Sequence, residues 1–208
     1  MWLVLALGNP GERYARTRHN VAWRTLDLLA ARHGAGEVPG HAAFHARRTT
    51  LAGHEVELLK PLTFMNRSGE ALLAWREREG VESQLLVVSD DVYLPLGRLR
   101  VRAGGSSGGH RGLESIEAAV GSRDYDRLRI GVGAAEDSSA LREHVLEEFA
   151  AEESPVLEEV IRRAADAVEC WVAEGALGAM NQFNRKDDPE PSAEQAGGEP
   201  ERQEESEP

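Results

Sequence analysis

The chain of 208 residues contains a single cysteine, Cys170. One thiol cannot form a disulfide within the chain, and it excludes a metal cluster held by several cysteines. No apolar run approaches the ~20 residues that span a bilayer. The apolar stretch 2–7 is six residues long and lacks the basic leader and cleavage pattern of a signal peptide. We therefore predict a cytoplasmic protein with no membrane segment.

Lysine is also scarce, since nearly all of the 24 basic residues are arginines, and the formal net charge is −12. The last 23 residues, 186–208, hold nine acids and two bases, so this tail carries −7 and residues 1–185 carry −5. With two alanines as its only apolar residues, the tail cannot offset its ordering entropy, and we predict that it is disordered. It is either an acidic interaction arm or a solvating segment without a partner.

Short apolar runs alternate with helix patterns along residues 1–185. The expected strands cover 2–7, 43–51, 54–60, 85–88, 98–102 and 128–132, and helices are expected from Asn20, after Ser68 and from Ser154. Asn20 and Ser154 are the expected helix caps, and Ala52-Gly53 is the expected hairpin turn. The alternation predicts an α/β fold, with a single three-layer α/β/α domain and a mixed, mostly parallel twisted sheet.

Polar side chains gather in four loops at the ends of these elements. The loops are Gly8-Asn9-Pro10-Gly11, Arg18-His19-Asn20, Met65-Asn66 and Ser89-Asp90-Asp91. In an open α/β sheet, sites form at the carboxyl ends of strands. A metal-free hydrolytic site could use His19 to take a proton from water, Asp90 to orient the imidazole, and the two amides to hold an oxyanion. The alternative is structural, with a turn asparagine, a helix-end histidine and a capping aspartate.

A glycine-rich loop, 104–112, lacks the signatures of a nucleotide phosphate loop. Arginines flank it on two expected strands, and alternation places those of each strand on one face. The arginines are Arg98, Arg100, Arg102, Arg127 and Arg129, with Arg111 inside the loop. If the strands are neighbours, these side chains form a phosphate-binding patch. An ordinary solvated sheet face is the alternative.

Six motifs stand in a fixed order along residues 2–184. They are LGNPGERYARTRHN (7–20), KPLTFMNRSG (60–69), VVSDD with LPLG (87–97), GGSSGGHRGL (104–113), RLRIGVG (127–133) and AMNQFN (179–184). In order and spacing this set resembles the bacterial-type peptidyl-tRNA hydrolases. The resemblance implies that residues 1–185 are a catalytic domain of this kind.

The resemblance implies a monomeric cytoplasmic enzyme of translation, with no cofactor and no metal. It would hydrolyse the ester between peptide and tRNA, recycling tRNA that ribosomes release prematurely. His19 would be the general base, Asp90 its support, and Asn9 the residue that distinguishes peptidyl from aminoacyl esters. The residues implied in binding substrate or tRNA are Tyr14, Phe64, Asn66, His110, Arg111, Arg102 and Arg129, the last two at the 5′-phosphate of the acceptor end.

Two positions depart from the pattern of the family. Arg111 stands where an asparagine is usual, and it could meet a phosphate near the acceptor end or point to solvent. Tyr93 stands where the acidic loop usually has a second aspartate. We expect Tyr93 to support the site rather than to contact substrate.

Two other classes of function stay open at this point. Some relatives of this fold serve as non-catalytic RNA-binding or splicing cofactors, and fold alone does not determine function. An unrelated metal-free esterase or amidase for small molecules is the third hypothesis, although it would not need an arginine patch.

Overall fold

The computed structural model describes residues 1–80, 83–134 and 140–184. The tail, 186–208, lies outside these residues, so its disorder and its role stay predictions. The elements in chain order are β1 (Trp2–Ala6), η1 (Glu12–Tyr14), η2 (Arg18–Asn20), α1 (Val21–Arg32), β2 (Gly36–Glu37), β3 (Phe44–Leu51), β4 (His54–Pro61), η3 (Met65–Arg67), α2 (Ser68–Glu79), β5 (Gln84–Asp91), β6 (Leu99–Ala103), α3 (Arg111–Val120), β7 (Asp126–Gly131), α4 (Leu141–His144), η4 (Ala151–Glu153) and α5 (Ser154–Phe183).

The strands form one seven-stranded sheet in the order β2-β3-β4-β1-β5-β7-β6. The pairings β4–β1, β1–β5 and β5–β7 are parallel, whereas β2–β3, β3–β4 and β7–β6 are antiparallel. The mixed sheet is therefore as predicted, and its parallel part is the central four strands. Because their carboxyl ends lie at one edge, the loops after β1, β4, β5 and β7 meet there.

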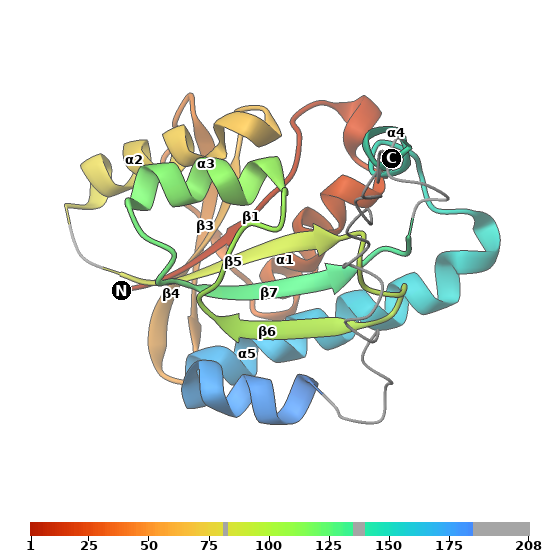
Figure 1. Cartoon of the computed structure of the whole chain (residues 1–208). Coiled ribbons are helices and arrows are strands. Elements are labelled where there is room, and N and C mark those ends of the chain that lie inside the picture. Colours follow the sequence, from red (N-terminus) through yellow and green to blue (C-terminus); the bar gives the residue numbers. More distant parts are fainter. Residues whose placement is uncertain (81–82, 135–139, 185–208) are drawn as a thin grey trace, which may run out of the picture.

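Helices cover both faces of the sheet, as Figure 1 shows, with α2 and α3 together on one side and α5 on the other. The side chains of β1 alternate between the two layers, as period-2 geometry requires. Val4 and Ala6 join the core under α1 and α5, while Leu3 and Leu5 join the core under α2 and α3. The predicted α/β/α architecture is confirmed.

The β3–β4 hairpin turns at the predicted pair. Ala52 has φ 47° and Gly53 has φ 82°, and two successive positive φ angles match the right-handed twist of the flanking strands. The hairpin builds the β2–β3–β4 side of the sheet.

Two expectations about helices are wrong. No helix was expected after the glycine-rich loop, yet α3 begins at Arg111. The sequence pattern did not reveal this helix, because its cap is a histidine, His110, which is not a usual capping residue. Ser154 is not a cap either, since the 3₁₀ turn η4 leads straight into α5 and gives Ser154 helical angles.

The long helix α5 ends by holding the edge of the sheet. It breaks at Gly175, where φ is 73°, a left-handed value that favours glycine. Asn184 then donates to the carbonyl of Val101 on edge strand β6 and accepts from its N–H, both at 2.7 Å. The amide thereby supplies the two hydrogen bonds that a further strand would give. Across the described ranges, no helix has both the length and the apolar character of a membrane span.

The contact between α2 and α3 depends on a glycine. A Cβ at Gly69 would lie 2.2 Å from the Ser115 carbonyl oxygen. We expect Gly69→Ala to lower the free energy of unfolding in urea by about 1–3 kcal/mol, as overpacking does. Gly40→Ala is the control, because a Cβ there meets nothing within 4 Å, and its effect should stay within about 0.5 kcal/mol. Equal stability of the two variants would contradict the close approach.

Candidate active site

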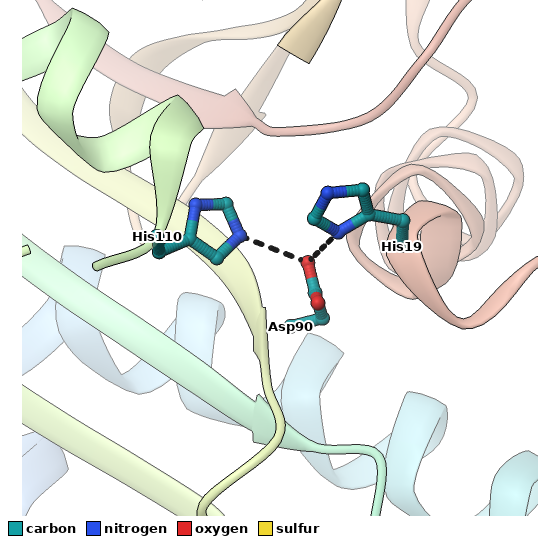
Figure 2. A group of neighbouring side chains, drawn as sticks. All are labelled: His19, Asp90 and His110. Atoms are coloured by element: carbon teal, nitrogen blue, oxygen red, sulfur yellow. Dashed lines mark hydrogen bonds and ion pairs between the residues drawn. The ribbon is translucent and has the colours of Figure 1, made fainter. Parts of the chain in front are cut away.

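Three side chains meet at the carboxyl end of β5, as Figure 2 shows: Asp90 from the strand, His19 from η2 and His110 from the loop before α3. Asp90 Oδ1 lies 2.7 Å from His19 Nδ1 and 3.0 Å from His110 Nε2. The carboxylate is 1% exposed, whereas the two rings are 14% and 13% exposed. One buried oxygen thus joins two imidazoles that reach the cleft.

The tautomer of His110 follows from its hydrogen bonds. Its Nδ1 accepts from the backbone N–H of Gly112 at 3.1 Å and of Leu113 at 3.3 Å, so the ring caps α3. A nitrogen that accepts carries no proton, so the ring proton is on Nε2 and is donated to Asp90. His110 is therefore a fixed donor and is unsuited to act as a base.

The same logic gives His19 the opposite tautomer. Its Nδ1 donates to Asp90, and Nε2 has no partner among the residues that the structure describes. The backbone N–H of His19 donates to the Val145 carbonyl at 2.9 Å, and that of Arg18 to the Glu147 carbonyl at 2.9 Å. The ring is therefore oriented by its side chain and its backbone, and it presents a free lone pair at the cleft.

Asp90 stays ionised in this arrangement. Burial alone raises the pKa of its carboxyl, but the hydrogen bonds from His19 and His110, together with the electrostatic attraction of their N–H groups, outweigh burial and hold the pKa well below its usual range. The carboxylate can therefore stabilise a positive charge that forms on His19.

Asn9 is held by another asparagine. The Asn9 N–H donates to Asn20 Oδ1, and Asn20 Nδ2 donates to the Asn9 carbonyl, both at 2.9 Å. Asn20 stands at the N-cap position of α1, as expected, but its side chain makes no cap hydrogen bond to the helix. Asn9 Oδ1 accepts from the backbone N–H of Met65 at 2.9 Å. This leaves Asn9 Nδ2, which donates to no described residue, as an oriented donor at the cleft.

These groups line a cleft of about 490 Å³. It brings together all but one of the residues to which the family resemblance gave a catalytic or binding role. Those lining the cleft are Asn9, Tyr14, His19, Phe64, Asn66, Asp90, His110, Arg111 and Arg129. Arg102 is the exception, because it lies exposed on edge strand β6, outside the cleft lining.

The expected arginine patch is only partly correct. Strands β6 and β7 are neighbours, and Arg102 stands opposite Arg127. Arg127, however, is 2% exposed, with its guanidinium 3.1 Å from Glu117 and stacked 4.3 Å over Tyr125. It belongs to the packing beneath α3, so it cannot bind a phosphate.

Arg129 has a divided role. Its Nε lies 2.8 Å from Asp91 Oδ2, while its two Nη groups have no partner in the described part of the chain. A guanidinium with five N–H donors can keep this ion pair and still bind an anion with its Nη groups. Arg129 therefore remains a candidate for the tRNA phosphate.

No pattern in the sequence predicted the residues that form one wall of the cleft. Arg142, Val145 and Leu146 come from the segment around α4, which lies along residues 17–19. Arg18 holds this segment through a bidentate ion pair with Glu153, at 2.7 and 3.0 Å. No local pattern could predict a contact between residues this far apart in the chain.

The chain is similar to known proteins over nearly its whole described length. A family model described as peptidyl-tRNA hydrolase matches residues 3–191. The peptidyl-tRNA hydrolase of Chloroflexus aggregans is 45% identical over 186 residues, 88% of this chain and 99% of that protein. That of Symbiobacterium thermophilum is 42% identical, over 88% and 98% respectively. The crystal structure of peptidyl-tRNA hydrolase from Acinetobacter baumannii has a TM-score of 0.80 at 31% identity and covers 88% of this chain and 94% of that chain.

The low pKa of Asp90 makes stability depend on pH. A carboxyl with a lowered folded-state pKa stabilises the fold above its unfolded value, about 3.9, and this contribution is lost as the pH falls below it. We expect Asp90→Asn to flatten the fall of unfolding free energy between about pH 4 and 2.5, by up to about 1.4 kcal/mol per pH unit. Urea titrations at several pH values measure this slope. The exposed Asp166→Asn variant should keep the wild-type slope, and an unchanged slope in Asp90→Asn would refute the shift.

Proposed function

The chain belongs to the peptidyl-tRNA hydrolase family and hydrolyses peptidyl-tRNA, and we propose that His19 is the general base of this reaction. The observation that carries the proposal is the free Nε2 of His19, which faces the cleft while Nδ1 is held by a buried carboxylate. A positioned base of this kind contributes about 10²–10⁴-fold to a rate.

The reaction is an attack of water on the ester carbonyl. His19 Nε2 takes a proton from the water as its oxygen bonds to the carbonyl carbon, and Asp90 stabilises the imidazolium that forms. The tetrahedral intermediate then collapses, and His19 returns the proton to the departing ribose oxygen. The products are the peptide carboxylic acid and the free tRNA hydroxyl. These steps need no metal, because the base, the carboxylate and the amide donors supply the chemistry.

The amide of Asn9 is suited to the carbonyl side of the reaction. Its Nδ2 is a donor held in place by the Met65 and Asn20 hydrogen bonds, and a preorganised donor stabilises a developing oxyanion. Asn66 lies exposed at the same cleft. We assign to these two amides the binding of the acyl carbonyl and of the peptide bond that distinguishes peptidyl from aminoacyl esters.

The two ends of the substrate would bind on different sides of His19. We assign the peptide to the side of Tyr14 and Phe64, since Phe64 is 52% exposed at the cleft. We assign the acceptor end, with its 5′-phosphate, to the side of Arg129 and Arg102. Arg111, which is exposed at the cleft, adds a third cation. We further propose that the enzyme acts as a monomer in the cytoplasm.

The other two hypotheses lose support. The matched relatives bear the name of a hydrolase, and a non-catalytic RNA-binding or splicing cofactor would not need the Asp90–His19 pair that this chain retains. A small-molecule esterase would not need cations beside the cleft.

The base is tested by His19→Ala. We expect turnover of an N-blocked aminoacyl-tRNA to fall by about 10²–10⁴-fold, with wild-type cleavage unaffected by EDTA and the unblocked ester spared. The matched control is His45→Ala, because His45 pairs with Glu37 at the surface, outside the cleft. Near-normal turnover in His19→Ala would remove His19 from the mechanism.

The phosphate assignment is tested by Arg102→Glu and Arg129→Gln. Each should raise KM for the tRNA ester and lower the salt dependence of log KM by about 0.7–0.9 for each phosphate that the variant no longer neutralises. The control is Arg162→Glu, an exposed arginine of α5 paired with Glu159. Unchanged KM and salt slope would show that the tRNA is anchored elsewhere.

A further inference from the structure

An exposed aromatic ring stands at the cleft with no described partner. Tyr93 is 64% exposed and lines the cleft, in a chain with three tyrosines and 5% aromatic residues. Tyrosine is enriched at binding interfaces, because its ring offers apolar area while its hydroxyl stays solvated. The expectation that Tyr93 only supports the site does not fit this exposure, because a supporting ring would be covered by its neighbours.

The loop that carries Tyr93 is held firmly. The backbone N–H of Tyr93 donates to Asp91 Oδ1 at 3.0 Å, and the Gly133 N–H donates to the Leu94 carbonyl at 3.2 Å. Gly131 permits this approach, since a Cβ there would lie 2.1 Å from the Pro95 carbonyl oxygen. The ring is therefore presented from a preorganised backbone, which lowers the entropic cost of binding.

The strand order decides which half of the substrate meets this ring. The loop of Tyr93 crosses the carboxyl end of β7, the strand that carries Arg129. Phe64 follows β4, on the opposite side of β1 and β5. By strand order the two exposed aromatic rings of the cleft thus stand on opposite sides of β1 and β5, with Tyr93 on the side of Arg129.

We propose that the ring of Tyr93 stacks on a base of the single-stranded 3′ end of the tRNA. This inference rests on the proposed function and adds a residue that binds the nucleotide half of the substrate. Stacking suits the role, because every base offers a π-face and binding then tolerates any sequence. The Asp91 carboxylate accepts from the Tyr93 backbone N–H with one oxygen and pairs with Arg129 through the other, so the loop of Tyr93 is tied to the same carboxylate as a guanidinium that can hold the adjoining phosphate.

The test uses Tyr93→Ala, Tyr93→Leu and Tyr93→Phe. Leu keeps apolar area without a planar face, and Phe keeps the face without the hydroxyl. Leu177→Ala is the control, since Leu177 is 70% exposed on α5, outside the cleft. The substrates are N-acetyl-aminoacyl-tRNA and the same ester with one base of the 3′ end at a time replaced by an abasic nucleotide. Each is prepared with a small and a large aminoacyl side chain.

We expect kcat/KM for the intact substrate to fall by about 5- to 100-fold in Tyr93→Ala and Tyr93→Leu, the range that stacking on one base supports. Most of the decrease should be in KM, and Tyr93→Phe should stay within about twofold. The decrease should vanish on the one abasic substrate that lacks the stacked base, as a double-mutant cycle requires.

Three outcomes would overturn the inference: no decrease in Tyr93→Ala, equal activity of the Leu and Phe variants, or a decrease that follows the aminoacyl side chain instead of the base. The last would place the ring on the peptide. Failure of the wild type to cleave any tRNA ester would overturn the proposed function as well. If the wild type cleaves the tRNA ester and the Tyr93 variants cleave it equally well, this inference alone would be overturned.

Discussion

A single carboxylate oxygen, Asp90 Oδ1, accepts hydrogen bonds from two imidazoles that come from different layers of the fold. His19 precedes α1 on one face of the sheet, and His110 caps α3 on the other. A buried charge is costly unless it is paired, so this site exists only when both layers are packed on the sheet. Each ring also receives its tautomer from the shared oxygen, which leaves one nitrogen of His19 free at the cleft.

Several arginines of this chain form ion pairs with buried or partly buried acids of the fold. Glu57 is fully buried on β4 and is paired with Arg48 and Arg78, and Arg127 is buried against Glu117. These guanidiniums are paired with acids of the protein itself. An acidic chain can nevertheless bind a phosphate, because local placement of a few cations, and not net charge, creates the field at a site.

Much of the fold could be predicted from the sequence, because its signals are local. Apolar runs and alternating patterns predicted every strand except the two-residue β2, and two positive-φ positions matched the expected hairpin turn. The helix after the glycine-rich loop was missed because its cap is an imidazole, and histidine is not among the usual capping residues. Asparagine is a common cap, so Asn20 was expected to cap α1 with its side chain. In the structure, that side-chain amide hydrogen-bonds the backbone of Asn9 instead.

The sequence alone was sufficient for the α/β class, for the family resemblance and for most of the cleft residues, because strand ends and ordered motifs are properties of the chain as written. Tertiary structure decided which groups are available. It buried Arg127, left Arg102 outside the cleft and brought the segment around α4 against residues 17–19 through Arg18 and Glu153. It also exposed Tyr93 on the side of Arg129. The reason is physical: exposure and pairing depend on neighbours that are distant in sequence, and only packing of the layers brings them together.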